Sequence, residues 1–596
     1  MSFINPHRFT TRPEIQGTFG VVATTHWIAT AVGMGMLERG GNAFDAAAAA
    51  AFSLQIVEPH LNGPGGDAPI MLFDAKRGRT EVICGQGPAP GAATIAHYQG
   101  FGLDLVPGTG LLAACIPGTF DAFLLLLRDR GTMSLDDVLE PAIGYASNGH
   151  PLLERASATI ATVKDLFLAH WPTSAALWLD QGDAPPPGAI FRNPTLASTF
   201  RRILREAAIV RGREARIDRA RKVWSEGFVA EAIDRFCATQ EVMDVSGRAH
   251  RGVLSGADMA AWSATSEDPI GYDYGRYRVL KPAPWCQGLV ALQQLALLKA
   301  FAFDDLDPTG PDFIHLQVEA AKLAFADRDT FYGDPNFVET PVDVLLSDAY
   351  NAKRRALVGE RASLEQRPGS VAGFGRAFET RSATGERRFA GVGEPTVGRL
   401  GESRGDTVHF DIVDRFGNMV SATPSGGWLQ SSPTIPELGF CLGTRAQMFT
   451  LDERHPACLK PGKRPRTTLS PTLALRDGEP YLAWGTPGGD QQDQWIPQFF
   501  LRHVHAGFNL QESIDAPAWH TEHFPSSFWP RAARPGVVVV EDRIPAETIR
   551  ALRNRGHEVE VGPAWSEGRL VAASRDNDRM KAAANPRGMQ GYAAGR

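Results

Sequence analysis

The chain has 596 residues, of which 43% are hydrophobic and 21% charged, so it can bury a large core and has an ordinary globular composition. Its 61 Lys and Arg against 67 Asp and Glu give a net charge of −6, too mild to favour nucleic acid or an anionic membrane as a partner. No early apolar stretch has the length of a secretory signal or a membrane span. We therefore expect a cytoplasmic protein that binds neither nucleic acid nor membrane.

The N-terminal part of the chain predicts strands alternating with helices. Phe19–Ala23 is strand-like, and residues 28–39 have helical spacing. Asp45 opens an alanine-rich helix whose small side chains allow close packing, and the apolar run 68–73 predicts a buried strand. The periodicity of residues 110–350 is mainly helical.

Residues 359–406 differ in character from what precedes them. Gly, Arg, Glu and Ser dominate and the apolar periodicity is lost, which predicts an exposed, mobile linker. Strand-like alternation returns at Thr407–Asp414, and the chain stays β-rich to about Ile514. A strand at 537–541 and a helix around 546–555 are expected near the end.

Metal and cofactor signals are weak. The six cysteines are scattered without a CxxC pair, which predicts buried thiols and no disulfide framework or zinc site. His503, His505, His520 and His523 form no HExxH motif and lack a cysteine or carboxylate at a useful spacing. We expect no cofactor and no metal, with a structural ion left open. The basic stretch 201–221 is interpreted as a solvated helix face.

The junction between Asp406 and Thr407 carries the chemistry that the sequence predicts. If this peptide bond breaks, Thr407 has a free α-amine beside its hydroxyl, so that nucleophile and base belong to one residue. Read alone, Thr407 is more simply a strand-edge residue, because β-branched side chains favour strands, and Gly488-Gly489 is more simply a turn. The linker before Thr407 and the glycine pair after it together favour catalysis.

Several motifs occur in an order and spacing that resemble the γ-glutamyltransferase family. They are Gly40–Asp45, Glu58–His60, Lys322–Asp329, Gly405–Asp414 with Ser421–Ser425, Arg464–Pro471 and Gly485–Asp490. The resemblance runs from about residue 18 to the C-terminus. It implies an N-terminal-nucleophile hydrolase with an α/β fold of the four-layer α-β-β-α type.

The resemblance also implies that the chain cuts itself between Asp406 and Thr407. The Thr407 hydroxyl would attack the Asp406 carbonyl, and water would hydrolyse the resulting ester. The products would be a large subunit, residues 1–406, and a small subunit, residues 407–596, that remain together as a heterodimer. Further dimerisation is left open.

Roles for other residues follow from the same resemblance. Gly488 and Gly489 would donate backbone N–H groups to the oxyanion, because they lack side chains that block the approach. Ser425 would hold the amine of the nucleophile. Thr467 and Thr468 stand where the family has two serines that contact the substrate carboxylate.

Four positions depart from the family pattern for recognising an amino acid. Gln86 replaces the arginine that grips the α-carboxylate, and an amide cannot copy a bidentate guanidinium contact. Met448 replaces the aspartate that binds the α-ammonium, Gly427 replaces an asparagine, and Arg445 replaces a neutral glutamine. We therefore expect a pocket with no acid for an ammonium and with an added cation.

The predicted function is hydrolysis of a small-molecule amide, with acyl transfer left open. The acyl group would be small and carboxylate-bearing, as in the oxamate amidohydrolase-like or cephalosporin acylase-like members of the family. One alternative is a true γ-glutamyl hydrolase or transferase that acts on glutathione-like compounds. A second alternative is a non-catalytic binding protein on the same fold, which would leave the chain uncut.

Overall fold

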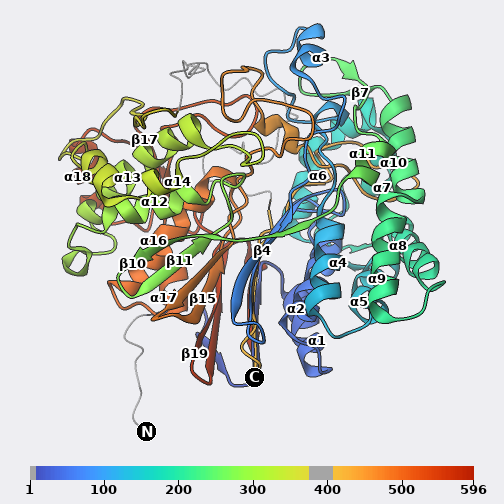
Figure 1. The fold of residues 1–596 in the computed structure, drawn as a ribbon, viewed down its shortest axis with the longest axis horizontal. Coiled ribbons are helices and arrows are strands. Elements are labelled where there is room, and N and C mark those ends of the chain that lie inside the picture. Colours follow the sequence, from blue (N-terminus) through green and yellow to red (C-terminus); the bar gives the residue numbers. More distant parts are fainter. Residues whose placement is uncertain (1–8, 375–406) are drawn as a thin grey trace.

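Two antiparallel sheets, each of seven strands among the described residues, face each other at the centre of the protein (Figure 1). The computed structural model describes residues 9–374 and 407–596. One sheet has the order β1 (Ile15–Gly17), β20 (Arg579–Ala584), β19 (Val571–Asp576), β15 (Glu479–Gly485), β14 (Thr472–Arg476), β11 (Tyr277–Lys281) and β10 (Ile270–Tyr274). The other has the order β21 (Tyr592–Gly595), β2 (Gly20–Thr24), β12 (Phe410–Asp414), β13 (Met419–Ala422), β3 (Ala68–Asp74), β4 (Arg79–Gly85) and β9 (Thr265–Glu267).

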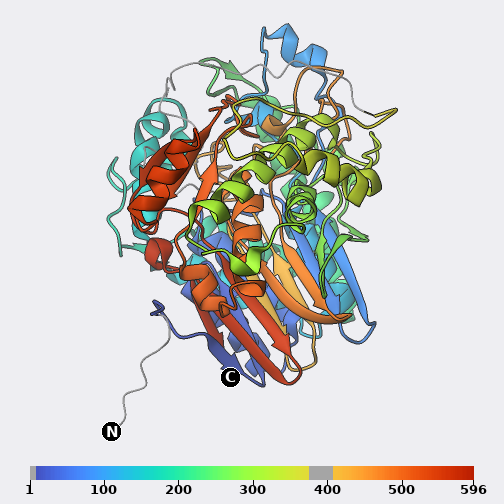
Figure 2. The ribbon, with the colours of Figure 1, turned by 90° about the vertical axis from the view of Figure 1, so that its left-hand side faces the viewer.

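Helices cover the outer face of each sheet (Figure 1). Beside the sheet that contains β12 lie α1 (Trp27–Glu38), α2 (Ala43–Val57), α4 (Thr119–Arg130), α5 (Leu135–Asn148), α6 (Glu154–His170), α7 (Pro172–Trp178), α8 (Pro194–Ala207), α9 (Arg213–Ser225), α10 (Phe228–Thr239) and α11 (Gly256–Ala261). Beside the sheet that contains β15 lie α12 (Leu289–Leu298), α13 (Pro311–Phe331), α16 (Gln492–Val504) and α17 (Leu510–Asp515) (Figure 2). No helix within the described ranges is long and apolar enough to cross a membrane.

Smaller elements complete the fold. A three-stranded sheet is formed by β16 (Trp519–Thr521), β17 (Val537–Glu541) and β18 (Glu558–Gly562). The remaining helices are α3 (Ile95–Gly100), α14 (Val342–Leu345), α15 (Asp348–Arg355) and α18 (Ala546–Asn554), and the short strand pairs are β5 (His150–Pro151) with β6 (Ile190–Phe191) and β7 (Val242–Met243) with β8 (Ala249–His250).

The alternation of side chains along β12 decides which of them face the interior between the sheets. Val413 belongs to the cluster that both sheets share, with Leu473 of β14 and Ala483 of β15. Phe410 and Ile412 instead join the cluster made with the outer helices. Because successive side chains of a strand point to opposite faces, the odd-numbered residues of β12 face the second sheet.

Most local predictions are confirmed. The helix predicted over residues 28–39 is α1, which spans Trp27–Glu38 with Arg39 as its C-cap; residues 68–73 belong to β3, and β17 spans Val537–Glu541 as expected. The alanine-rich helix begins at Ala43, slightly before Asp45, because Asn42 caps it and Asp45 completes the capping box. All six cysteines are buried and free.

The basic stretch 201–221 forms parts of α8 and α9, and several of its arginines are paired with acids. Arg202 bonds Glu206 at 2.8 Å, and Arg221 bonds Asp121 at 2.6 Å. Such pairing is typical of a helix surface and not of a face that binds phosphates.

The structure describes only residues 359–374 of the predicted linker 359–406. Residues 375–406, which include Asp406 of the predicted cleavage site, lie outside the described residues. The covered part makes specific contacts. The Gly369 N–H donates to Asp327 at 2.7 Å, and Arg367 donates to Glu319 at 2.8 Å. This part of the chain is therefore attached to α13.

Candidate active site

Thr407 and Ser425 are directly opposite each other at the end of two paired strands. β12 and β13 are neighbours in the sheet, and the extended chain beyond their ends continues the pairing as a single bridge between Thr407 and Ser425. Their hydroxyl oxygens are 3.1 Å apart and both residues are buried. The structure thus brings the expected nucleophile into contact with the residue expected to hold it.

Gly488 and Gly489 begin a tight turn that leads into α16. Their φ angles are 130° and 56°, in the range that favours glycine. A Cβ atom on Gly488 would lie 2.4 Å from the Trp495 ring, and one on Gly489 would lie 2.7 Å from the Phe528 ring. The backbone conformation and the close packing both require residues without side chains here.

A buried polar network holds this turn in place. Gln287 donates from Nε2 to the carbonyl of Gly489 at 3.3 Å, and Asp490 accepts from the backbone N–H of Ser527 at 2.7 Å. Arg328 Nη1 donates to the Asp490 carboxylate oxygen Oδ1 at 2.5 Å and to the Gln287 amide oxygen Oε1 at 3.1 Å. No motif in the sequence identifies Gln287 or Ser527, whereas Arg328 belongs to the motif Lys322–Asp329.

Thr467 and Thr468 lie next to the same network. The carbonyl of Thr467 accepts from the Gln287 N–H at 2.9 Å, so this segment and the Gly489 turn share one partner. Both threonines are buried, and Thr468 Oγ1 has no hydrogen-bond partner within the described residues. A buried hydroxyl of this kind can bind a substrate oxygen.

Arg445 does not add a net charge to the site, which corrects the expectation from the sequence. Its guanidinium donates two hydrogen bonds to the carboxylate of Asp67, at 2.7 and 2.9 Å. Asp67 is in turn paired through its backbone with Ser425, at 2.8 and 2.9 Å. The positive charge of Arg445 is therefore neutralised by Asp67, which contacts Ser425, which in turn contacts Thr407.

Gln86 and Gly427 also lie near this ion pair. Gln86 is fully buried, and its Oε1 has no hydrogen-bond partner within the described residues. Gly427 has a φ of 67°, and a Cβ atom there would lie 3.0 Å from the carbonyl oxygen of Cys441. The loop at Gly427 is thus too closely packed to carry a larger residue without a shift.

Met448 belongs to a small buried apolar cluster with Trp428 and Phe528. Trp428 follows Gly427 in the chain, and Phe528 packs against Gly489. The cluster therefore connects the loop beyond Ser425 with the glycine turn, and it places apolar atoms where the family resemblance implied an acid. No motif in the sequence identifies Phe528 as part of the site.

His409 and Asp411 form a buried pair on the same face of β12 as Thr407. His409 Nε2 is 3.1 and 3.2 Å from the two carboxylate oxygens of Asp411, and Nδ1 is 2.8 Å from Thr423 Oγ1. Burial raises the pKa of Asp411, while His409 and a hydrogen bond from Ser421 lower it. His409 and Asp411 follow Thr407 at steps of two residues, a spacing in the sequence that indicates a shared strand face.

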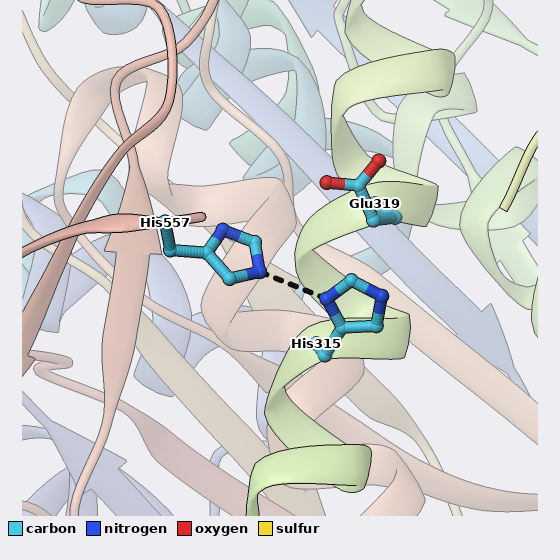
Figure 3. A group of neighbouring side chains, drawn as sticks. All are labelled: His315, Glu319 and His557. Atoms are coloured by element: carbon cyan, nitrogen blue, oxygen red, sulfur yellow. Dashed lines mark hydrogen bonds between the residues drawn. The ribbon is translucent and has the colours of Figure 1, made fainter. Parts of the chain in front are cut away.

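A second polar group, away from this site, consists of His315, Glu319 and His557 (Figure 3). Their potential ligand atoms lie within 4.8 Å of one another. The two histidines are already joined by a hydrogen bond of 2.8 Å, and Glu319 accepts from Lys322 at 2.6 Å and from Arg367 at 2.8 Å. Because two cations already face the carboxylate, charge repulsion disfavours a metal ion here.

The four histidines near the C-terminus do not converge on one point. They bond separately, His503 to Tyr481, His505 to Tyr274, His520 to Glu567 and His523 to the backbone of Gly536.

Comparison with known proteins places the chain among amide-cleaving enzymes. A family model described as gamma-glutamyltranspeptidase matches residues 29–595. The glutathione hydrolase-like YwrD proenzyme of Bacillus subtilis is 30% identical over 586 residues, covering 96% of this chain and 98% of that protein. The oxamate amidohydrolase proenzyme of Klebsiella pneumoniae is 30% identical over 591 residues, covering 97% and 98%.

Two solved structures agree with this over almost their whole length. The structure of LmbA2991HD has a TM-score of 0.93 at 55% identity, covering 99% of this chain and 100% of that one. A cephalosporin acylase from Bacillus halodurans has a TM-score of 0.82 at 28% identity, covering 100% and 99%. The fold and these relatives define an N-terminal-nucleophile hydrolase, an enzyme class that cleaves amides. The chain belongs to the gamma-glutamyltranspeptidase family, as its motifs indicated.

Proposed function

We propose that this chain is a self-processing amidohydrolase whose nucleophile is Thr407 and whose substrate carries a small acyl group with a carboxylate. The observation that carries the proposal is the buried contact of 3.1 Å between the hydroxyls of Thr407 and Ser425. A threonine hydroxyl is a weak nucleophile until a base and a fixed hydrogen-bond partner act on it. Ser425 supplies the partner, and cleavage before Thr407 supplies the base.

Self-cleavage would occur between Asp406 and Thr407. The Thr407 oxygen attacks the Asp406 carbonyl and the C–N bond breaks, giving an ester and a free amine on Thr407. Water then hydrolyses the ester. The relatives named above are proenzymes, which supports this step.

The fragments 1–406 and 407–596 would remain together as a heterodimer, because both sheets contain strands of each. β12 of the small fragment lies next to β2 of the large one, and β14 lies next to β11. The two facing sheets with helices on their outer sides also support the four-layer α-β-β-α class (Figure 1).

Turnover would use the freed amine as the base. The amine takes the hydroxyl proton of Thr407 while the oxygen attacks the substrate carbonyl, and the N–H groups of Gly488 and Gly489 stabilise the oxyanion. The amine then protonates the leaving group as the C–N bond breaks. Water, or an acceptor amine, takes the acyl group from Thr407 by the reverse sequence of proton transfers.

The surroundings of the nucleophile support an acyl group without an α-ammonium. Met448 lies in an apolar cluster, and the carboxylate of Asp67 is occupied by Arg445. The hydroxyls of Thr467 and Thr468 are proposed to bind the substrate carboxylate. The names oxamate amidohydrolase and cephalosporin acylase among the relatives agree with acyl groups of this kind.

The test combines one variant with one substrate comparison. Wild type should give two fragments on a denaturing gel, the smaller beginning at Thr407, and Thr407→Ala should stay whole and inactive. Wild type should hydrolyse oxamate or a glutaryl anilide faster than a γ-glutamyl anilide. Normal cutting of Thr407→Ala would overturn the nucleophile, turnover of the γ-glutamyl compound alone would support the glutathione-like alternative, and an uncut wild type would support the binding protein.

A further inference from the structure

Three cross-strand pairs of polar side chains extend from the nucleophile into the space between the two sheets. We call them the polar ladder, and they are Thr407 with Ser425 at 3.1 Å, His409 with Thr423 at 2.8 Å, and Asp411 with Ser421. All six are buried on the inward faces of the chain segments around β12 and β13. The next inward pair, Val413 with Met419, is apolar and belongs to the core between the sheets.

The His409 ring is fixed by packing as well as by hydrogen bonds. A Cβ atom on Gly485 would lie 2.4 Å from its Cε1 atom, so the ring fills the space that a side chain at this position of β15 would need. Gly485 ends β15 and leads directly to Gly488 and Gly489. His409 therefore lies on the same chain segment as Thr407 and packs against the end of β15, the strand that leads to Gly488 and Gly489.

The hydrogen bonds of the polar ladder have one direction. His409 Nε2 lies between the two carboxylate oxygens of Asp411, at 3.2 and 3.1 Å, as an N–H group shared by both oxygens does, so we assign the ring proton to Nε2. In the neutral ring Nδ1 is then the acceptor, and the Thr423 hydroxyl donates to it. With its own proton used in this way, the Thr423 oxygen can only accept from its other neighbours.

We propose that His409, oriented by Asp411, is a positioning residue that acts through Thr423 on the Thr407–Ser425 pair. Neighbouring pairs on one strand face are about 6.6 Å apart, so the His409–Thr423 bond joins the two chain segments one step along from the Thr407–Ser425 pair. By fixing Thr423 against His409, this bond sets the position of Ser425 two residues further on. The contact of 3.1 Å between the Ser425 and Thr407 hydroxyls is thereby held in place.

A purely structural role is a poor account of the His409–Asp411 pair. Desolvating a carboxylate is costly unless its hydrogen bonds are satisfied, and replacement by apolar residues of similar volume is often neutral or stabilising. Val413, on the same face of the same strand, shows that apolar packing is available here. His409 and Asp411 therefore have a use besides filling the core.

The inference rests on the proposed role of Thr407, so the test uses self-cleavage, which needs no added substrate. The rate at which the fragment 407–596 forms is measured by denaturing gel after purification of the uncut chain. Thr423→Val keeps the volume but removes the hydroxyl, and should slow cleavage at least about tenfold, less than the roughly 10²–10⁴-fold effect of a direct acid–base group because Thr423 acts through the Thr407–Ser425 pair. Thr423→Ser restores the hydroxyl and should stay within about threefold of wild type, on the same scale.

A matched control separates positioning from damage to the strand. Asp414 lies on the same strand as Asp411, is also buried, and bonds Ala43 and Asn418 on the opposite face. Asp414→Asn should leave the cleavage rate within about threefold, whereas Asp411→Asn should slow it at least about tenfold. If both variants slow it equally, His409 and Asp411 are structural and the proposal fails.

A double variant tests whether the parts act as one unit. Adding Thr423→Val to Asp411→Asn should cost less than about threefold more, since groups that act together are not additive. In the processed enzyme, assayed with glutaryl p-nitroanilide, kcat should fall while KM stays within about twofold. Full additivity of the two substitutions, or a normal cleavage rate for Thr423→Val, would overturn the role of His409 and leave Thr407 as the proposed nucleophile. A wild-type chain that stays uncut would overturn both the role of His409 and the proposed nucleophile.

Discussion

Arg445 and Asp67 form a bidentate ion pair in the interior, and the same Asp67 is joined through its backbone to Ser425, the partner of the nucleophile. The two side chains are 4% and 5% exposed, so their charges are almost completely removed from water. Each therefore depends on the other for compensation. The pair connects the loop around Arg445 to the nucleophile without adding net charge.

Removing one member of this pair should be much worse than removing both. Asp67→Asn leaves the guanidinium without the carboxylate of Asp67 and should lower the free energy of unfolding by about 3–5 kcal/mol. The double variant Asp67→Asn with Arg445→Met should recover a large part of this loss, because the buried charge is gone. Urea denaturation of the uncut Thr407→Ala chain measures these two variants and Arg445→Met alone. If the two single losses simply add in the double variant, the ion pair contributes nothing specific.

Glu58 should make stability depend on pH. Burial raises the pKa of its carboxyl from 4.5 to about 8, against the opposing effects of Thr25, Arg569 and Arg155. Between about pH 4.5 and about pH 8 the folded chain keeps a proton on Glu58 that the unfolded chain has lost, so the free energy of unfolding falls as pH rises and levels off above that window. The slope is at most about 1.4 kcal/mol per pH unit.

Glu58→Gln stays neutral at every pH and should lose this dependence. Urea denaturation from about pH 5 to about pH 9, again in the uncut Thr407→Ala chain, gives the difference between the two proteins. The variant should gain stability relative to its parent as pH rises. Parallel curves for the two proteins would show that Glu58 is ionised in the folded state throughout.

Gly488 should not tolerate alanine, whereas a distant glycine of similar conformation should. A Cβ atom on Gly488 meets the Trp495 ring at 2.4 Å, while Gly478, with a φ of 89°, has open space around it. Both substitutions cost about 1–3 kcal/mol of backbone strain, but only Gly488→Ala also displaces the turn. We expect Gly488→Ala to reduce kcat at least about a hundredfold, the effect of losing one oxyanion donor, and Gly478→Ala to leave kcat unchanged. Equal kcat values would rule out the turn as an oxyanion site.

The sequence predicted the parts of this protein that depend on local rules. The helix α1, the apolar strand β3 and the apolar run of β17 all follow from neighbours in the chain, whereas the contact of Thr407 with Ser425 was expected from the family resemblance. The pair His409–Asp411 was equally accessible, because alternation places both on the face of Thr407. It was not predicted because the family resemblance assigned no role to His409 or Asp411 within the motif Gly405–Asp414.

Contacts across long separations could not be predicted in this way. Asp67 and Arg445 are 378 positions apart, and Gln287 and Gly489 are 202 apart. Arg445 looked like an added cation only because no pattern in the sequence identifies its partner. Tertiary packing decides such charges, so the electrostatics of a pocket follow from the fold and not from its lining residues alone.

Met448 offers the sharpest test of substrate choice. Met448→Asp would return a carboxylate to the position that the family resemblance assigns to ammonium recognition, beside Trp428 and Phe528. A carboxylate in an apolar cluster is costly unless a cation binds it, so a substrate with an α-ammonium gains more from the change than one without. We expect kcat/KM for a γ-glutamyl anilide, divided by that for a glutaryl anilide, to rise at least about tenfold, which corresponds to about 1.4 kcal/mol.

Met448→Asn is the matched control, because it has nearly the same shape as the aspartate but no charge. Its ratio should stay within about twofold of wild type, and both variants should still self-cleave, since Met448 has no proposed part in that step. An equal rise in the two variants would show that pocket size, and not charge, selects the substrate. No change in either would mean that the acyl group does not reach the cluster of Trp428, Met448 and Phe528.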